Sequence, residues 1–153
     1  MSQSGSCPVR RIQNKPPLKG EIPCQKTRVR SPRVHEPPAK TFSQALRKGN
    51  HLFIAGQTAR DPKGKIVGKG DAIRQARQVF RRIQALVESA GGTLSDVLKL
   101  TVYITDIRDA QGVRAVRKEF FKGNFPTSTL LCVTALADPD YLVEIEAEAI
   151  LDD

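Results

Sequence analysis

The sequence contains no tryptophan, few other aromatic residues and no long hydrophobic run. Its core must therefore be built mainly from Val, Ile, Leu and Ala, and its 153 residues allow one domain. No apolar run approaches the length of about 18 residues that a membrane-spanning helix requires, so we expect no membrane association. The N-terminus also lacks the continuous apolar stretch of a secretory signal. We therefore expect a small cytoplasmic protein that association of subunits would help to stabilise.

Metal-ligating residues are also scarce. The three cysteines, Cys7, Cys24 and Cys132, form no Cys-x-x-Cys pair, and the two histidines, His35 and His51, lie far apart in the sequence. Because no zinc-ligand spacing is present, we expect neither a metal site nor a cofactor. An odd number of cysteines is typical of free thiols in a reducing compartment, and a Cys7–Cys24 disulfide is the alternative.

Positive charge is concentrated before residue 41. The net charge is +9, but residues 1–41 hold nine Lys/Arg and two Glu, whereas the remainder holds sixteen basic and fourteen acidic side chains. Seven of the ten prolines lie in the same segment. We therefore predict a basic, Pro-rich arm over residues 1–40, extended or mobile over residues 1–30, and one domain over residues 41–153. The arm is expected to be solvated, to pack on a neighbouring subunit or to contact an anion; without interleaved aromatic residues, nucleic-acid binding is not expected.

Two segments show helical periodicity. Asp71 begins a helix whose apolar residues recur every three or four positions as far as Ala90, where Gly91-Gly92 ends it. A second helix is predicted over residues 109–121. Four arginines of the first helix lie off its apolar stripe: Arg74, Arg77, Arg81 and Arg82. Strands are predicted at residues 51–55, 97–105, 127–136 and 142–151, with a small meander over residues 42–68. This order predicts an α+β fold, in which both helices cover one face of the sheet.

The last predicted strand carries an acidic face. Glu144, Glu146 and Glu148 alternate with apolar residues and therefore point to the same side of the sheet. Three glutamates on a fully buried face would be strongly destabilising without partners. Plain solvent exposure explains this pattern, and so does a subunit interface with water-filled clefts.

Several segments of this chain resemble the reactive intermediate deaminase (Rid) family over about residues 40–150. They are Gly49-Asn50 with Leu52-Phe53-Ile54-Ala55-Gly56-Gln57, the helix from Ala76 to Gly92, Asp96 to Tyr103, Phe125-Pro126, and Val143-Glu144-Ile145-Glu146-Ala147. The resemblance implies a chorismate-mutase-like subunit with a mixed sheet, which forms a homotrimer around a central barrel. It also implies three clefts between neighbouring subunits, where family members hydrolyse reactive enamines and imines to ketones and ammonia. The expected partner is therefore a small-molecule substrate.

The resemblance assigns the family's catalytic glutamate to Glu144, which would position or activate water. The family's cleft tyrosine falls on Phe42, its serine on Ala55, its substrate-clamping arginine on Ser128 and a frequent cysteine on Leu130. The substrate-binding positions carried over are thus Phe42, Ala55, Gly56, Gln57, Ser128 and Leu130, with Arg114 and Arg117 as candidate replacement cations.

Loss of the arginine has a calculable consequence for carboxylate binding. Hydrogen bonds to charged groups contribute about 1.5–3 kcal/mol each, so its replacement by Ser128 predicts carboxylate binding weaker by roughly 10- to 100-fold or more. We therefore expect an atypical deaminase, a hydrolase of C–N bonds, that acts on an aminomuconate-type or less polar biosynthetic intermediate rather than on 2-aminoacrylate. The alternatives are a non-catalytic trimer that binds a small ligand or protein, and a ribonuclease or translation inhibitor.

Overall fold

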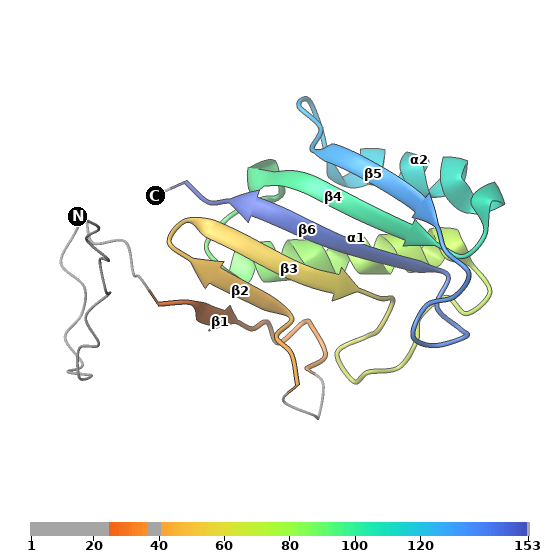
Figure 1. Ribbon diagram of the computed structural model, residues 1–153, viewed down its shortest axis with the longest axis horizontal. Helices are drawn as coiled ribbons and strands as arrows, with labels where there is room; N and C mark the ends of the chain where they lie inside the picture. The colour runs from red at the N-terminus through yellow and green to blue at the C-terminus, as the bar shows by residue number, and fades with distance from the viewer. Residues whose placement is uncertain (1–24, 37–40, 153) are drawn as a thin grey trace, which may run out of the picture.

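The computed structural model describes residues 25–36 and 41–152. Figure 1 shows one twisted sheet with both helices on the same side of it. The strands are β1 (Thr27–Val29), β2 (Ala45–Lys48), β3 (His51–Gln57), β4 (Val97–Ile104), β5 (Thr127–Cys132) and β6 (Val143–Ile150). The helices are α1 (Ala72–Ser89) and α2 (Ala110–Phe120), with short 3-10 turns η1 (Leu94–Asp96) and η2 (Ile107–Asp109). The predicted α+β class is confirmed.

The six strands lie in the order β1-β2-β3-β6-β4-β5. Only β4 and β5 run parallel, and every other neighbouring pair is antiparallel, which makes the sheet mixed. β6, the last strand in the chain, inserts between β3 and β4. Its acidic face therefore lies at the middle of the sheet rather than at an edge.

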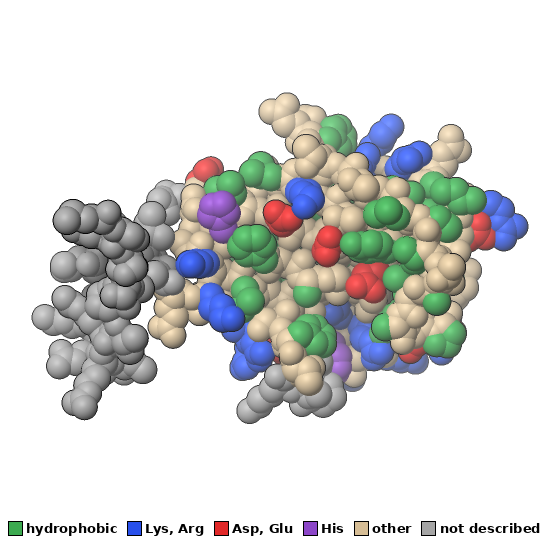
Figure 2. Space-filling model, in the orientation of Figure 1, with side chains coloured by type: hydrophobic (Ala, Val, Ile, Leu, Met, Phe, Trp, Pro, Cys, Tyr) green, Lys and Arg blue, Asp and Glu red, His purple; other side chains and the backbone are tan. Residues whose placement is uncertain are grey.

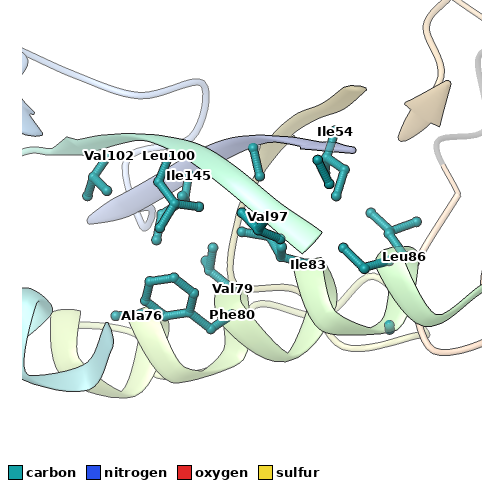
Figure 3. Close-up of a cluster of buried hydrophobic side chains, with 14 of the residues drawn as sticks. Ile54, Ala76, Val79, Phe80, Ile83, Leu86, Val97, Leu100, Val102 and Ile145 are labelled. Atoms are coloured by element: carbon teal, nitrogen blue, oxygen red, sulfur yellow. The ribbon is translucent and has the colours of Figure 1, made fainter. Parts of the chain in front are cut away.

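The core lies between α1 and the covered face of the sheet. The apolar stripe of α1 packs on inward-facing residues of the central strands, as Figure 3 shows for Phe80, Ile83 and Ile145 among others. Asp71 caps the helix, because its side chain accepts a hydrogen bond of 2.9 Å from the backbone N–H of Arg74. The predicted periodicity and N-terminus of this helix are both confirmed.

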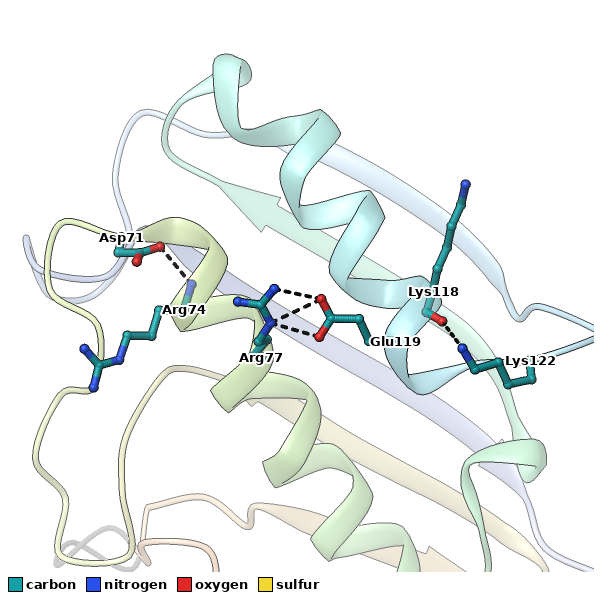
Figure 4. A network of polar contacts seen from close by, with 6 residues as sticks. All are labelled: Asp71, Arg74, Arg77, Lys118, Glu119 and Lys122. Carbon is teal, nitrogen blue, oxygen red and sulfur yellow. Dashed lines mark hydrogen bonds and ion pairs between the residues drawn. The ribbon is translucent and has the colours of Figure 1, made fainter.

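An exposed ion pair joins the two helices on their outer side. The Arg77 guanidinium donates to both carboxylate oxygens of Glu119, at 2.8 and 3.2 Å from Nε (Figure 4). This pairing raises the pKa of Arg77 and lowers that of Glu119. Exposed ion pairs contribute little to stability, so this one adds little to the free energy of folding.

Most strand ends differ by one or two residues from those expected from the sequence, and two boundaries differ by more. The strand predicted over residues 127–136 ends at Cys132, and residues 25–36, assigned above to the arm, carry β1, which pairs with β2. Val29 and Val34 are buried, so this part of the expected arm packs on the domain. Residues 1–24 and 37–40, including Cys7 and Cys24, lie outside the described residues. Cys132 is an exposed free thiol.

Neither helix of the described residues covers the second face of the sheet (Figure 1). Figure 2 shows acidic side chains among hydrophobic ones on this face. The strand registers place Phe53, Leu131 and Ile150 on this face, and each is more than a third exposed. In the part of the chain that the structure describes, no helix is long and apolar enough to cross a bilayer.

Candidate functional site

A cavity of about 550 Å³ lies where β3 ends and β6 begins. Residues from β3, β6, α1 and the neighbouring loops line it: His35, Phe42, Gln44, Gly56, Thr58, Arg60, Arg82, Ala137, Asp138, Tyr141 and Glu144. Its volume falls within the range of about 300–1,000 Å³ that is typical of small-molecule sites. The structure therefore places the predicted Glu144, Phe42 and Gly56 together in one hollow.

Glu144 differs from the other two glutamates of β6 in having no hydrogen bond from any described residue. Glu148 pairs with Lys99 on β4 at 2.7 Å, and Glu146 accepts a 3.2 Å hydrogen bond from the Tyr103 hydroxyl. Burial, and to a lesser degree the nearby Glu146, raise the pKa of Glu144 above its ordinary value. A carboxyl group with a raised pKa and no protein partner is suited to exchanging protons with a ligand.

Gly56 makes room for this carboxylate. The pairing of β3 with β6 shifts register between Ile54 and Gln57, and Gly56 lies within the shift. A β-carbon at position 56 would lie 1.9 Å from Oε1 of Glu144. The glycine of the Gly56-Gln57 pair therefore leaves space in the cavity for the Glu144 carboxylate, because it has no side chain.

Gln57 lies behind the cavity wall rather than on it, because its side chain is fully buried. Its Nε2 donates to Oε1 of Gln44 at 2.8 Å and to the carbonyl of Ala55 at 2.9 Å, while its Oε1 accepts a hydrogen bond of 3.1 Å from Nε of Arg82. Gln57 thus supports lining residues from behind. Ala55 lies in a separate hollow on the open face, beside Lys99 and Glu146.

The remaining predicted residues lie on the other face of the sheet. Ser128, Leu130, Arg114 and Arg117 line a pocket of about 100 Å³ against Phe80. Because side chains alternate along a strand, Ser128 shares the covered face with Leu100, its register partner on β4. Glu144 shares the open face with Tyr103. One subunit therefore does not bring Glu144 and Ser128 into the same site.

Two arginines that sequence reasoning did not select lie in the Glu144 cavity. Arg82 lies off the apolar stripe of α1, yet only 3% of it is exposed, and burial lowers its pKa to about 10. Arg60 follows β3 and comes before a tight turn in which Oδ1 of Asp61 accepts hydrogen bonds from the N–H groups of Lys63 and Lys65. The sequence contained one indication that Arg82 is buried. Position 82 lies three residues after the apolar Val79, and residues three apart lie near the same face of a helix.

Within residues 25–36 and 41–152, no three His, Cys, Asp or Glu side chains gather as a metal site requires. His35 and Asp138 do line the cavity with Glu144. The charged groups of the cavity are therefore the carboxylates of Glu144 and Asp138 and the guanidinium groups of Arg60 and Arg82, around a hollow large enough for a small molecule.

Comparison with known proteins agrees with this architecture. The family model described as endoribonuclease L-PSP matches residues 33–151. A RutC family protein of Pyrococcus horikoshii is 44% identical over 112 residues, covering 73% of this chain and 88% of that protein. The human 2-iminobutanoate/2-iminopropanoate deaminase is 33% identical over 109 residues, covering 71% and 79%. The crystal structure of YyfA, a conserved Rid family protein of Yersinia pestis, matches with a TM-score of 0.78 at 31% identity, covering 83% and 100%.

Proposed function

The chain belongs to the Rid family, and from this premise we propose that it hydrolyses a reactive enamine or imine in the cavity of Glu144. Relatives named as imine deaminases support this chemistry for the family. The observation that carries the proposal for this chain is Glu144 itself. It lines a small-molecule cavity, its pKa is raised, and no described residue donates a hydrogen bond to it.

The reaction requires a group that accepts a proton and later returns it. Water attacks the carbon of the C=N bond while Glu144 takes one proton from the water and the nitrogen gains another from solvent. The protonated Glu144 then donates to the amine of the carbinolamine, the C–N bond breaks, and ammonia leaves while the hydroxyl loses its proton to solvent and becomes the ketone carbonyl. An enamine enters the same sequence after protonation at carbon. A carboxyl group whose pKa is raised toward the working pH performs both transfers more effectively than an ordinary one.

We also propose that the working site lies between subunits of a homotrimer. Glu144 and Ser128 lie on opposite faces of one sheet, so a cleft that contains both positions needs two copies of the chain. In that arrangement the Ser128 pocket of one subunit would face the Glu144 cavity of the next. Phe42, half exposed at the mouth of the cavity, would then be covered.

The test compares two glutamates of the same strand face. Glu144→Gln keeps size and shape but removes the proton acceptor, so kcat for a surrogate imine should fall about 10²–10⁴-fold. Glu146→Gln is the matched control and should retain most of the rate. Circular dichroism and sedimentation should show that both variants keep their fold and assembly. Wild-type turnover by Glu144→Gln would instead favour a non-catalytic binding protein.

A further inference from the structure

We infer that Arg60 and Arg82 form an anion-binding subsite in the Glu144 cavity, which takes a carboxylate of the ligand in place of the arginine missing at Ser128. This inference deepens the proposed function and rests on it for the identity of the site. It assigns the cation to the same subunit as Glu144, whereas Arg114 and Arg117 lie in the pocket on the opposite face of the sheet.

Arg60 is held in place by neutral groups, which leave its charge unpaired. Its Nε donates to the Tyr141 hydroxyl, and its Nη1 donates to the carbonyl of Gly64 at 2.7 Å. The guanidinium lies over the Tyr141 ring, 5.3 Å from the ring centroid. Among residues 25–36 and 41–152, Nη2 has no hydrogen-bond partner and no carboxylate forms an ion pair with Arg60. The group is therefore oriented but not neutralised.

Arg82 is also held by neutral groups without an ion-pair partner among the described residues, and it is more deeply buried than Arg60. Its Nε and Nη1 donate to Oε1 of Gln57 and to the carbonyl of Arg60, at 3.1 and 3.2 Å. No described carboxylate lies within ion-pair distance, although Glu36 is close enough to favour the charged form. A buried charge without an ion-pair partner is destabilising. A ligand carboxylate in the cavity would relieve that cost.

Glu144 does not neutralise either arginine. The pKa of Glu144 is raised by burial and by Glu146, and neither Arg60 nor Arg82 lowers it. Asp138, the other acid that lines the cavity, accepts a 2.9 Å hydrogen bond from the N–H of Asp140. Among the described residues neither Glu144 nor Asp138 forms an ion pair with Arg60 or Arg82, so both guanidinium groups stay available to a ligand that has a carboxylate at one end and the reacting C=N bond at the other.

The planar forks of two guanidinium groups match a carboxylate in geometry as well as in charge. A carboxylate held by them would take over the binding that Ser128 has lost. Of the two kinds of substrate expected from the sequence, the subsite favours an anionic one, such as an aminomuconate-type intermediate, over a less polar one, and the substrate would be bound from the Glu144 side.

The test measures binding without turnover. The probes are 2-oxobutanoate, which is the product of hydrolysing 2-iminobutanoate, and its primary amide, titrated into the full chain and followed by the arginine Nε–Hε signals in nitrogen-15 spectra. Wild-type protein should bind the acid roughly 10- to 100-fold more tightly than the amide. Arg60→Gln should remove most of this preference. Arg114→Gln and Arg117→Gln, which remove the competing candidate cations beside Ser128, should keep it.

Arg82→Lys provides a second variant that keeps the charge and loses the fork. Arg82→Lys should lose part of the preference for the acid. If this variant fails to fold, Arg60→Gln decides the question, because Arg60 is only half buried and its replacement disturbs the fold less. Retention of the acid preference in Arg60→Gln, its loss in Arg114→Gln or Arg117→Gln, or its absence from the wild type would each overturn the inference.

The two proposals fail in distinguishable ways. Glu144→Gln should keep the acid-over-amide preference, because the subsite lies apart from the carboxyl. If Glu144→Gln turns over like the wild type while the preference still depends on Arg60, the proposed function is wrong and the subsite stands. If Glu144→Gln is inactive but the wild type shows no acid preference, the hydrolysis stands and the subsite is wrong.

Discussion

Glu144 carries an energetic cost in the folded chain. Burial raises its pKa, which means that its charged form is less stable in the native state than in the unfolded chain. Glu146 and Glu148, by contrast, have partners on β4. Retaining an unpartnered acid at such a position is typical of residues kept for chemistry rather than for stability.

This cost predicts a pH-dependent effect on stability. A carboxyl group with a raised native pKa binds protons more tightly in the folded state, so its destabilisation is fully present above that pKa. The penalty disappears as the pH falls below the ordinary value of 4.5. Glu144→Gln should therefore unfold at a higher temperature than the wild type at neutral pH, and the difference should shrink toward pH 4. Thermal scans over this range test it, and a lower melting temperature at neutral pH would contradict it.

Gly56→Ala tests the close approach of the backbone to Glu144. The added β-carbon would overlap the flexible end of the Glu144 side chain and displace the carboxylate, so the variant should lose most of its activity but no more than about 1 kcal/mol of stability. In a Glu144→Ala background the overlap is gone, and Gly56→Ala should then cost little stability. A double-mutant cycle by urea denaturation measures this coupling. Equal losses in both backgrounds would show that the backbone, not Glu144, requires glycine.

Single residues of the site were predictable to different degrees. Glu144, Phe42 and Gly56 were identified from a motif read along the chain, and the structure brings these three together. Arg60 and Arg82 were not identified. Arg82 was expected to be solvated, because a helical arginine beside an apolar stripe normally is. Only the loop after β3, folded back over α1, turns that position into a cavity wall.

At the scale of elements, α1 shows how a local signal fixes a boundary. Asp71→Ala removes the side-chain acceptor from the first turn and should lower the free energy of unfolding by about 0.5–2 kcal/mol, measured by urea denaturation. Asp109 is the matched control, because it occupies the same position before α2 but makes no side-chain cap hydrogen bond. Asp109→Ala should cost clearly less, and equal losses would show that helix-dipole effects, not the cap, dominate.

Elements with strong periodicity were predicted well, and those defined by their neighbours were not. The stripe of α1 and the alternation of β6 are properties of the sequence itself. β1 is three residues long in a basic, proline-rich setting and exists only because β2 offers it a pairing edge. β5 is the edge strand at the other side, and the point where it leaves β4 has no clear local signal.

At the scale of the whole molecule, the open sheet face and the divided site point to the same arrangement. Half-exposed apolar side chains surround the acidic row of β6, a composition poorly suited to water alone. Of the predicted site residues, Ser128 and Glu144 lie on opposite faces of the sheet, so one subunit does not bring them into the same site. Sequence reasoning could list these residues, but the split between faces depends on strand register, which only the folded sheet fixes.

The trimer is the prediction that joins these facts. Sedimentation equilibrium at micromolar concentration should give about three times the chain mass of 16.9 kDa.

Phe53 is half exposed on the open face, so Phe53→Asp places a charge within the proposed interface and should shift the protein toward monomer with loss of activity. Ile107→Asp is the control, because this residue is still more exposed but lies in η2, outside the sheet; it should leave the mass unchanged. A wild-type monomer would contradict the prediction, and an active monomer would also place the whole reaction within the Glu144 cavity of one subunit.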